Sequence, residues 1–303
     1  MQLIWNSLFF TFAISIMACA QKTDERLKYL AQKPPSLEAE VFAPGHISRN
    51  QISEFGSVFN KDGTAFYYGI DIDGRTEIKY TELIKNKWSE PITILSHINY
   101  GFNDPFLSND EQRLYFISQK ALEDNTSKQD HDIWYVKKIG EKWSEPINAG
   151  TNINTKYNEY YMSFTEKGSM YFSSNKKSEN ENGQSFDIYY ADILNGEFQE
   201  AIRLGESINT NSYEADVFVD PDEQYLIFCS IRPGGKGRGD LYISFKDTDG
   251  SWTEAITMGD KINTKNHELC PFVSKDGKYF FYTSNQDIYW ISAEIIDELK
   301  QGR

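Results

Sequence analysis

The sequence predicts an all-β fold, a five-bladed β-propeller made of four-stranded antiparallel blades. Two observations carry this prediction. The tripeptide Ile-Asn-Thr recurs at 153–155, 208–210 and 262–264, about 55 residues apart, and the same order of strand-like runs and turns accompanies each copy. A repeat of this length is one supersecondary unit copied in a ring or an array, so it defines the architecture before any residue is given a function.

Each repeat begins with two strand-like phrases joined by a tight turn. The first phrases are aromatic and β-branched runs at 55–59, 104–108, 160–164, 216–219 and 270–274. The turns follow as Asp62-Gly63, Asp110-Glu111, Lys167-Gly168, Asp222-Glu223 and Asp276-Gly277. The second phrases stand at 66–68, 114–117, 170–172, 226–228 and 280–282. Short runs of this kind around an Asp-Gly-type turn are typical of β-hairpins.

Two further phrases complete the repeat. The third phrase opens with an acidic residue and then alternates, at 77–80, 132–135, 187–190, 240–243 and 287–290. The fourth phrase reads Trp-Ser-Glu-Pro or a close variant, at 88–91, 143–146, 198–201 and 252–255. Four strands per repeat make one blade of a propeller.

Ring closure is predicted from the strand that the last repeat lacks, because the chain ends soon after its third phrase. Residues 41–48 match residues 256–263 in length and in apolar positions. An N-terminal strand that completes the fifth blade would close the ring and remove the exposed sheet edges of an open array. Six blades are the alternative, if residues 23–40 hold a degenerate unit.

Residues 274–285 read Ser-Lys-Asp-Gly-Lys-Tyr-Phe-Phe-Tyr-Thr-Ser-Asn, and Asp-Ile-Tyr follows at 287–289. Together with Ser-Ile-Arg-Pro-Gly-Gly at 230–235, this pattern resembles the TolB-type WD40-like propeller repeat, often called PD40. The resemblance covers roughly residues 41–292 and implies a propeller fold. It implies no single function, since such repeats occur in periplasmic adaptors, envelope-protein modules and enzyme-attached domains alike.

The composition agrees with a secreted all-β domain. The 303 residues suffice for one large core, and 15% aromatic residues suit many short, half-buried strands. The net charge of −14 is repelled by phosphate backbones, so no nucleic acid is expected as a partner. We expect a monomeric ring.

The first 19 residues have the form of a secretory signal. An apolar run at 8–18 is too short to span a bilayer and ends in small residues. Ile16-Met17-Ala18-Cys19 resembles the lipobox of bacterial lipoproteins, which implies that Cys19 is lipidated. Residues 20–40 would then be a tether to an outer-membrane lipoprotein, periplasmic or surface-exposed. Ordinary cleavage after Ala20 and secretion is the alternative.

The remaining cysteines and the histidines indicate no metal site and no cofactor. Cys229 and Cys270 fall within strand phrases of neighbouring blades, and we expect buried thiols, with a disulfide between them as the alternative. The spacing of His46, His97, His131 and His267 is not that of a ligand cluster.

Acidic residues recur just before the innermost strands and are predicted to circle one end of the central channel. The candidate binding residues of this acidic collar are Glu54, Asp104, Glu159, Glu214, Asp216 and Glu268. Asp104 fits either the position of the glutamates or a position two residues further along, level with Asp216. The carboxylates could accept hydrogen bonds that lock one blade to the next, or they could converge on a cation, a basic peptide or a sugar.

Departures from the repeat are further pointers to function. Long loops are expected at 119–131, 176–185 and 232–239, all on one side of the ring, where binding surfaces usually reside. Residues 292–300 have apolar residues at helical spacing, so residues 293–303 are expected to form a short helix or tail.

The sequence therefore favours a non-catalytic, envelope-tethered propeller that binds envelope proteins or peptidoglycan-associated partners. No catalytic residue is assigned, because the chain has no Gly-x-Ser-x-Gly elbow, no phosphate loop and no plausible His-paired nucleophile. The alternative is a carbohydrate-active enzyme or sugar-binding protein that uses the acidic channel mouth.

Overall fold

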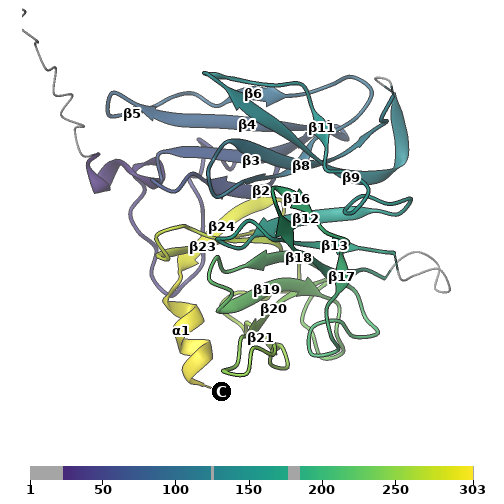
Figure 1. The fold of residues 1–303 in the computed structure, drawn as a ribbon. Helices are drawn as coiled ribbons and strands as arrows, with labels where there is room; N and C mark the ends of the chain where they lie inside the picture. The colour runs from purple at the N-terminus through teal and green to yellow at the C-terminus, as the bar shows by residue number, and fades with distance from the viewer. Residues whose placement is uncertain (1–22, 124–125, 177–184, 303) are drawn as a thin grey trace, which may run out of the picture.

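The protein is a five-bladed β-propeller. The computed structural model describes residues 23–123, 126–176 and 185–302, which form five antiparallel blades arranged in a ring (Figure 1). The six-bladed alternative is excluded, because residues 23–39 hold only two short 3-10 helices, at Glu25–Leu27 and Tyr29–Ala31.

The blades follow the order of the four phrases. Blade 1 comprises β2 (Ser53–Phe59), β3 (Ala65–Ile72), β4 (Arg75–Ile84) and β6 (Ile92–Leu95). Blade 2 comprises β7 (Asn103–Leu107), β8 (Arg113–Lys120), β9 (Ser127–Ile139) and β11 (Ile147–Asn148). Blade 3 comprises β12 (Glu159–Phe164), β13 (Met170–Ser174), β14 (Asp187–Ala191) and β17 (Ile202–Arg203).

The last two blades have the same order of strands. Blade 4 comprises β18 (Glu214–Val219), β19 (Tyr225–Ser230), β20 (Asp240–Phe245) and β21 (Ile256–Thr257). Blade 5 comprises β22 (Leu269–Val273), β23 (Tyr279–Ser284), β24 (Asp287–Ser292) and β1 (Glu40–Val41). Short outer pairings are made by β5 (Lys87–Trp88), β10 (Lys142–Trp143), β15 (Ile193–Leu194) and β16 (Glu197–Phe198).

The predicted closure by an N-terminal strand is confirmed. Strand β1 pairs with β24, and Val41 lies opposite Tyr289. In Figure 1 the yellow β24 lies beside the purple β2, so the two ends of the ring meet. The predicted alignment was wrong by one residue: Glu40, not Val41, takes the place of Ile256, because the loop before Ile47 holds one residue more than the loop before Ile262.

The segment before β1 lies across the closing seam. The Tyr29 backbone N–H donates to the Gly63 carbonyl at 2.9 Å, and the Tyr29 ring packs on Phe59 of blade 1 and on Tyr279 of blade 5. Gly63 has φ +67, and a Cβ there would meet the Tyr29 ring at 2.8 Å, so only glycine fits. We call residues 25–31 the strap.

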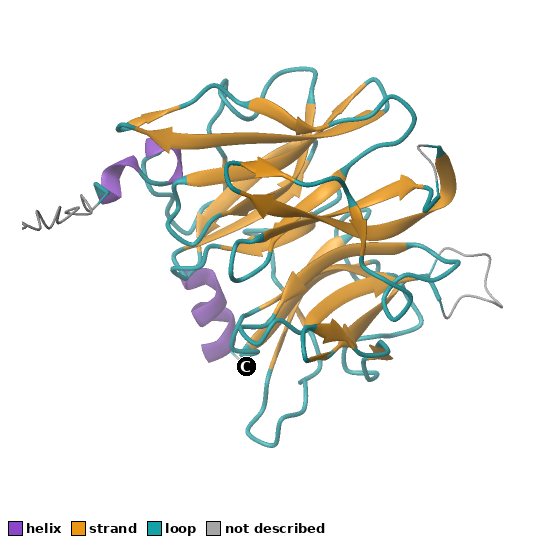
Figure 2. Cartoon of the chain, turned by 45° about the horizontal axis from the view of Figure 1, so that its top comes forward, coloured by secondary structure: helices purple, strands orange, loops and turns teal. Residues whose placement is uncertain are grey.

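The ring has two faces, which Figure 2 shows at opposite ends of the strands. The turn face carries the turns between the first and second strands of each blade, the strap and the helix α1 (Glu294–Gln301). The loop face carries the interblade loops and the predicted long loops, although residues 124–125 and 177–184 of those loops lie outside the described residues. No helix of the described chain is long and apolar enough to cross a bilayer.

The core lies between the blades and is strongly aromatic. One aromatic residue is buried at the same point of every second strand, namely Tyr68, Phe116, Phe172, Phe228 and Tyr282. Burial of such a side chain contributes about 2 kcal/mol. The expected C-terminal helix is present as α1, which buries Ile295 and Ile296.

Candidate functional site

The repeated Ile-Asn-Thr tripeptide is an interblade latch. The side chains of Asn154, Asn209 and Asn263 each pair with one residue of the third strand of the preceding blade. The amide oxygen accepts that residue's backbone N–H and the amide nitrogen donates to its carbonyl, at 2.7 to 2.9 Å. The isoleucine before each asparagine is buried, so it holds the loop in place.

Three collar glutamates complete this latch. Glu159, Glu214 and Glu268 are fully buried, and each accepts the backbone N–H of the threonine four residues earlier, at 3.1, 3.0 and 3.2 Å. Each also accepts that threonine's hydroxyl and a serine hydroxyl from the end of the second strand. These contacts tie the asparagine-threonine pair of one junction to both blades, as the blade-locking interpretation requires.

The other two junctions depart from this pattern. Glu54 accepts only the backbone N–H of Arg49, at 3.1 Å, and its second oxygen has no hydrogen-bond partner among the described residues. Burial raises the pKa of Glu54 to about 8. Blade 2 has the buried Phe102 at the collar position, so Asp104 lies two residues further along, level with Asp216. Of the six predicted collar residues, the four glutamates therefore share one position, and Asp104 and Asp216 share another that lies two residues further along.

A β-bulge in every innermost strand turns one residue toward the channel axis. The pairing of the first with the second strand shifts at this residue in all five blades. The five bulge residues are Gly56, Asp104, Tyr161, Asp216 and Cys270, with φ of 49°, 51°, 31°, 53° and 52°. A bulge bends its strand and redirects the side chain, which brings residues of blades far apart in sequence together.

Two of the bulge residues are carboxylic acids that converge on blade 5. The Cys270 thiol lies 3.4 Å from Asp104 Oδ1, and the Cys270 backbone lies near enough to the Asp216 carboxyl to lower its pKa in part. Gly56 leaves room for Asp104, since a Cβ there would meet Asp104 Oδ1 at 2.7 Å. Sequence reasoning included Asp104 and Asp216 among the channel acids, and the structure brings these two together.

The environment favours the neutral forms of both acids. Burial raises the pKa of Asp104 to about 6. Burial, and then the Asp104 charge, raise the pKa of Asp216 to about 8. Aromatic rings line the approach from the loop face: Phe186 stacks on Tyr160 at 4.8 Å and contacts Tyr213 at 5.5 Å between centroids. We call these three residues the aromatic row.

An aromatic plug separates the two ends of the channel. It consists of Phe106, Tyr161, Phe218 and Phe272, all buried and in ring contact. The Tyr161 hydroxyl donates to the Pro271 carbonyl at 2.9 Å, a bond from blade 3 to blade 5. Asp104 and Asp216 are themselves buried, and neither lines the recess of the turn face.

The turn face has an axial recess of about 430 Å³ to which all five blades contribute. The second residue of each turn lines it, and these residues are Lys61, Asn109, Glu166, Pro221 and Lys275. The Lys275 ammonium donates to Asn109 Oδ1 at 2.6 Å, and Asn109 in turn donates to the Thr165 carbonyl. Burial lowers the pKa of Lys275.

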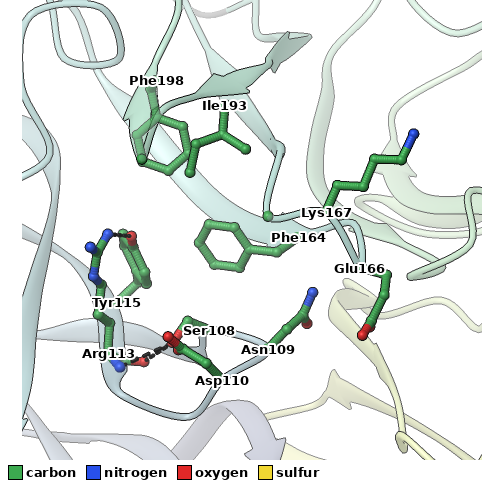
Figure 3. Close-up of a pocket in the computed structure, with 12 residues that line it drawn as sticks. Ser108, Asn109, Asp110, Arg113, Tyr115, Phe164, Glu166, Lys167, Ile193 and Phe198 are labelled. Atoms are coloured by element: carbon green, nitrogen blue, oxygen red, sulfur yellow. Dashed lines mark hydrogen bonds between the residues drawn. The ribbon is translucent and has the colours of Figure 1, made fainter.

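A second recess of about 240 Å³ adjoins the axial one between blades 2 and 3, and the two share Asn109 and Glu166. Figure 3 shows Phe164, Ile193 and Phe198 on one side of this flank recess and the Ser108–Asp110 turn on the other. Its end is formed by Arg113, whose guanidinium donates to the Tyr115 hydroxyl at 3.2 Å.

The turn-face recesses were not predicted from the sequence, because the turns served only to mark the boundaries between strands. A signal was available in the aligned copies. The flanking turn positions repeat Asp, Ser and Gly, whereas the second turn position holds Lys, Asn, Glu, Pro and Lys. A position that holds four residue types in five copies is not required by the blade itself, and such positions are available for binding.

The cysteines and candidate metal ligands are accounted for within the described chain. Cys229 and Cys270 are both buried and free, and Cys229 Sγ lies 3.4 Å from His267 Nε2. No group of three or more potential metal ligands occurs in residues 23–123, 126–176 and 185–302. Cys19 lies outside the described residues.

Fold and site together define a β-propeller with an aromatic plug in its channel and two adjoining recesses on the turn face. Solved structures of the same class include TolB from Acinetobacter baumannii, 16% identical with a TM-score of 0.50, and a protein of unknown function from Dyadobacter fermentans, 14% identical with a TM-score of 0.51. The alignments cover 78% and 86% of this chain. They cover 53% of the TolB chain and 84% of the other, so this chain spans about half the length of TolB.

A gluconolactonase from Xanthomonas campestris is a more distant neighbour, 10% identical with a TM-score of 0.46, over 84% of this chain and 87% of its own. The sequence matches no known protein family and no curated protein. Identities this low show the shared fold alone.

Proposed function

We propose that the chain is a non-catalytic, protein-binding propeller of the bacterial envelope, and that its contact surface is the turn face. The observation that carries the proposal is the axial recess, where five equivalent turn positions place two lysines, an asparagine, a glutamate and a proline around one axis. The three latch glutamates are occupied by blade-locking hydrogen bonds, which leaves them unsuited to bind a partner.

Photocrosslinking tests this proposal. A photoreactive amino acid at Lys61, which is exposed on the turn face, should give discrete protein adducts in intact envelopes. The same photoreactive amino acid in place of Ile98, which is 84% exposed in an interblade loop, serves as the control. It should give few protein adducts or none. Equal adducts at both positions, or none at Lys61, would exclude the turn face as the contact surface.

The envelope location is proposed from the lipobox-like residues 16–19 and from the PD40-like pattern. Only residues 20–22 separate Cys19 from the described chain, a distance of at most about 14 Å when extended. The strap that follows lies on the turn face. A lipid on Cys19 would therefore hold this face close to the membrane, and its partner would be a membrane-associated protein.

Labelling with a fatty-acid analogue tests the anchor. The wild-type chain should incorporate the label and fractionate with membranes, because lipidation requires the cysteine thiol. The Cys19→Ala variant should do neither. Release of the unlabelled wild-type chain into the medium would favour simple secretion instead.

The second candidate function is carbohydrate binding or hydrolysis at the loop face. It is favoured by the two convergent carboxyl groups of Asp104 and Asp216 beneath the aromatic row, since glycoside hydrolysis requires a pair of carboxyl groups. If this function holds, Asp104→Asn should abolish binding or turnover of a glycan at an unchanged melting temperature. A substitution on the turn face, such as Lys275→Met, should leave glycan binding or turnover intact.

A further inference from the structure

We infer that the axial recess binds the carboxy terminus of a peptide segment that has a basic residue just before its end. This inference rests on the proposed protein-binding function and adds the chemistry of the partner. It follows from the arrangement of one deep cation, acids at the rim and an adjoining apolar recess.

Lys275 provides the contact for the terminal carboxylate. It is partly buried in the axial recess, and Asn109 Oδ1 accepts one of its three N–H donors. Glu166, Glu111 and Asp220 act on Lys275 through their charge, but no ion pair within 4 Å joins it to a carboxylate of the described chain. A desolvated ammonium with donors to spare favours an anionic acceptor, and a carboxylate matches its single charge.

The rim of the recess favours a basic residue next to that carboxylate. Glu166 and Asp222 line the recess and are exposed, so these two acids outnumber the exposed Lys61 and give the rim a net negative charge toward an arriving ligand. The chain as a whole carries −14, which attracts basic segments and repels acidic ones. A phosphorylated or polyanionic ligand would be repelled by the same rim.

The flank recess accommodates an apolar side chain further back along the peptide. Phe164, Ile193 and Phe198 line it, and it joins the axial recess at Asn109 and Glu166. A ligand that reaches Lys275 can therefore extend across this shared wall without leaving the surface. The predicted ligand has, from its end backwards, a free carboxylate, a basic residue and an apolar residue.

Affinity selection with defined peptide pools tests the inference. The immobilised full chain is offered a random hexapeptide pool with free carboxy termini and the same pool with amidated termini. We expect the free-acid pool to be retained more than about tenfold over the amidated pool, with Lys or Arg enriched near the end, because truncation of a buried charge contact has at least this effect.

Two variants and one control identify the residues. Lys275→Met should remove the preference for the free acid, and Glu166→Gln should reduce the enrichment of basic residues. Lys278→Met, which removes a half-exposed lysine three residues from Lys275, should leave both unchanged.

Two results would overturn the inference: equal retention of acid and amide pools, or a free-acid preference that survives Lys275→Met. The crosslinks at Lys61 then test separately whether the turn face binds a protein at all. If the crosslinks at Lys61 persist, the protein-binding function stands and only the peptide chemistry is wrong. If they are absent as well, both fail.

Discussion

The bulge residue of the innermost strand has one backbone conformation in all five blades and four different side chains. A non-glycine residue at φ near +50° costs on the order of 1 kcal/mol, so four such residues in one ring store strain at the channel. Asp104 and Asp216 add an electrostatic cost, because burial opposes the charged forms of both and the Asp104 charge further opposes that of Asp216.

Substitution of Asp216 by Asn should stabilise the protein above neutral pH. The pKa of Asp216 is raised to about 8 in the folded chain, so between about pH 4 and 8 the unfolded state releases a proton that the folded state keeps. Stability from this group is therefore complete at low pH and is lost as the pH rises. Asn keeps an oxygen acceptor at this position but cannot ionise.

We expect Asp216→Asn to raise the free energy of unfolding by about 5 kcal/mol at pH 8.5 and to change it little at pH 4. Urea unfolding at both pH values measures this difference. Asp222→Asn, an exposed acid of the same blade, is the control and should show no such pH dependence. A constant difference between wild type and Asp216→Asn across the range would contradict the raised pKa.

At the scale of elements, the interblade latch explains why the Ile-Asn-Thr tripeptide recurs. The asparagine pairs with the third strand just beyond the end of the short fourth strand, where it accepts a backbone N–H and donates to a C=O. The threonine holds the glutamate of the next blade. The asparagine satisfies buried backbone groups of the preceding blade, and the threonine satisfies the buried glutamate of the next blade. Each latch therefore stabilises two blades at once.

Removal of one latch should destabilise the ring. Asn209→Ala leaves the backbone N–H of Ile188 without a partner in a buried junction, whereas the Ile188 carbonyl keeps the Leu204 N–H as a donor. We expect a loss of about 2 kcal/mol in denaturant unfolding. Asn211→Ala removes an exposed asparagine of the same loop and should stay within about 0.5 kcal/mol of wild type. Similar losses for both would show that the latch contributes nothing particular.

At the scale of the whole molecule, the junction that closes the ring has an incomplete latch. The junction between blades 5 and 1 has Ser48 in place of the latch asparagine and Arg49 in place of the threonine. Ser48 Oγ and Glu54 Oε2 are buried there without a hydrogen-bond partner in the described chain. The strap compensates, because Tyr29 packs on rings of both blades across this junction.

Tyr29→Ala should therefore loosen the closure before the rest of the ring. We expect a loss of about 3 kcal/mol in global stability from the emptied ring site. Hydrogen exchange should accelerate most at the Phe42 amide, which donates to Ile288 of β24. Tyr29→Phe keeps the ring contacts and should exchange like wild type. Uniform acceleration in all five blades would indicate that the strap does not act on the seam.

The strand phrases, turns and spacing of the repeat are local properties, and they were enough to predict five blades, the N-terminal closing strand and the C-terminal helix. Strand alternation and turn type depend on residues that are neighbours in the sequence. The position of the collar glutamates at the start of the first strands was likewise predictable, because it recurs with the repeat.

Only the tertiary structure decided what those residues contact. It placed Glu159, Glu214 and Glu268 within the latch, moved Asp104 to the bulge beside Asp216, and brought Lys275 and Asn109 together from blades 5 and 2. These contacts join residues as many as 166 positions apart. Their existence depends on the closure of the ring and on the bulge that redirects each inner side chain, and neither is encoded in the residues next to them.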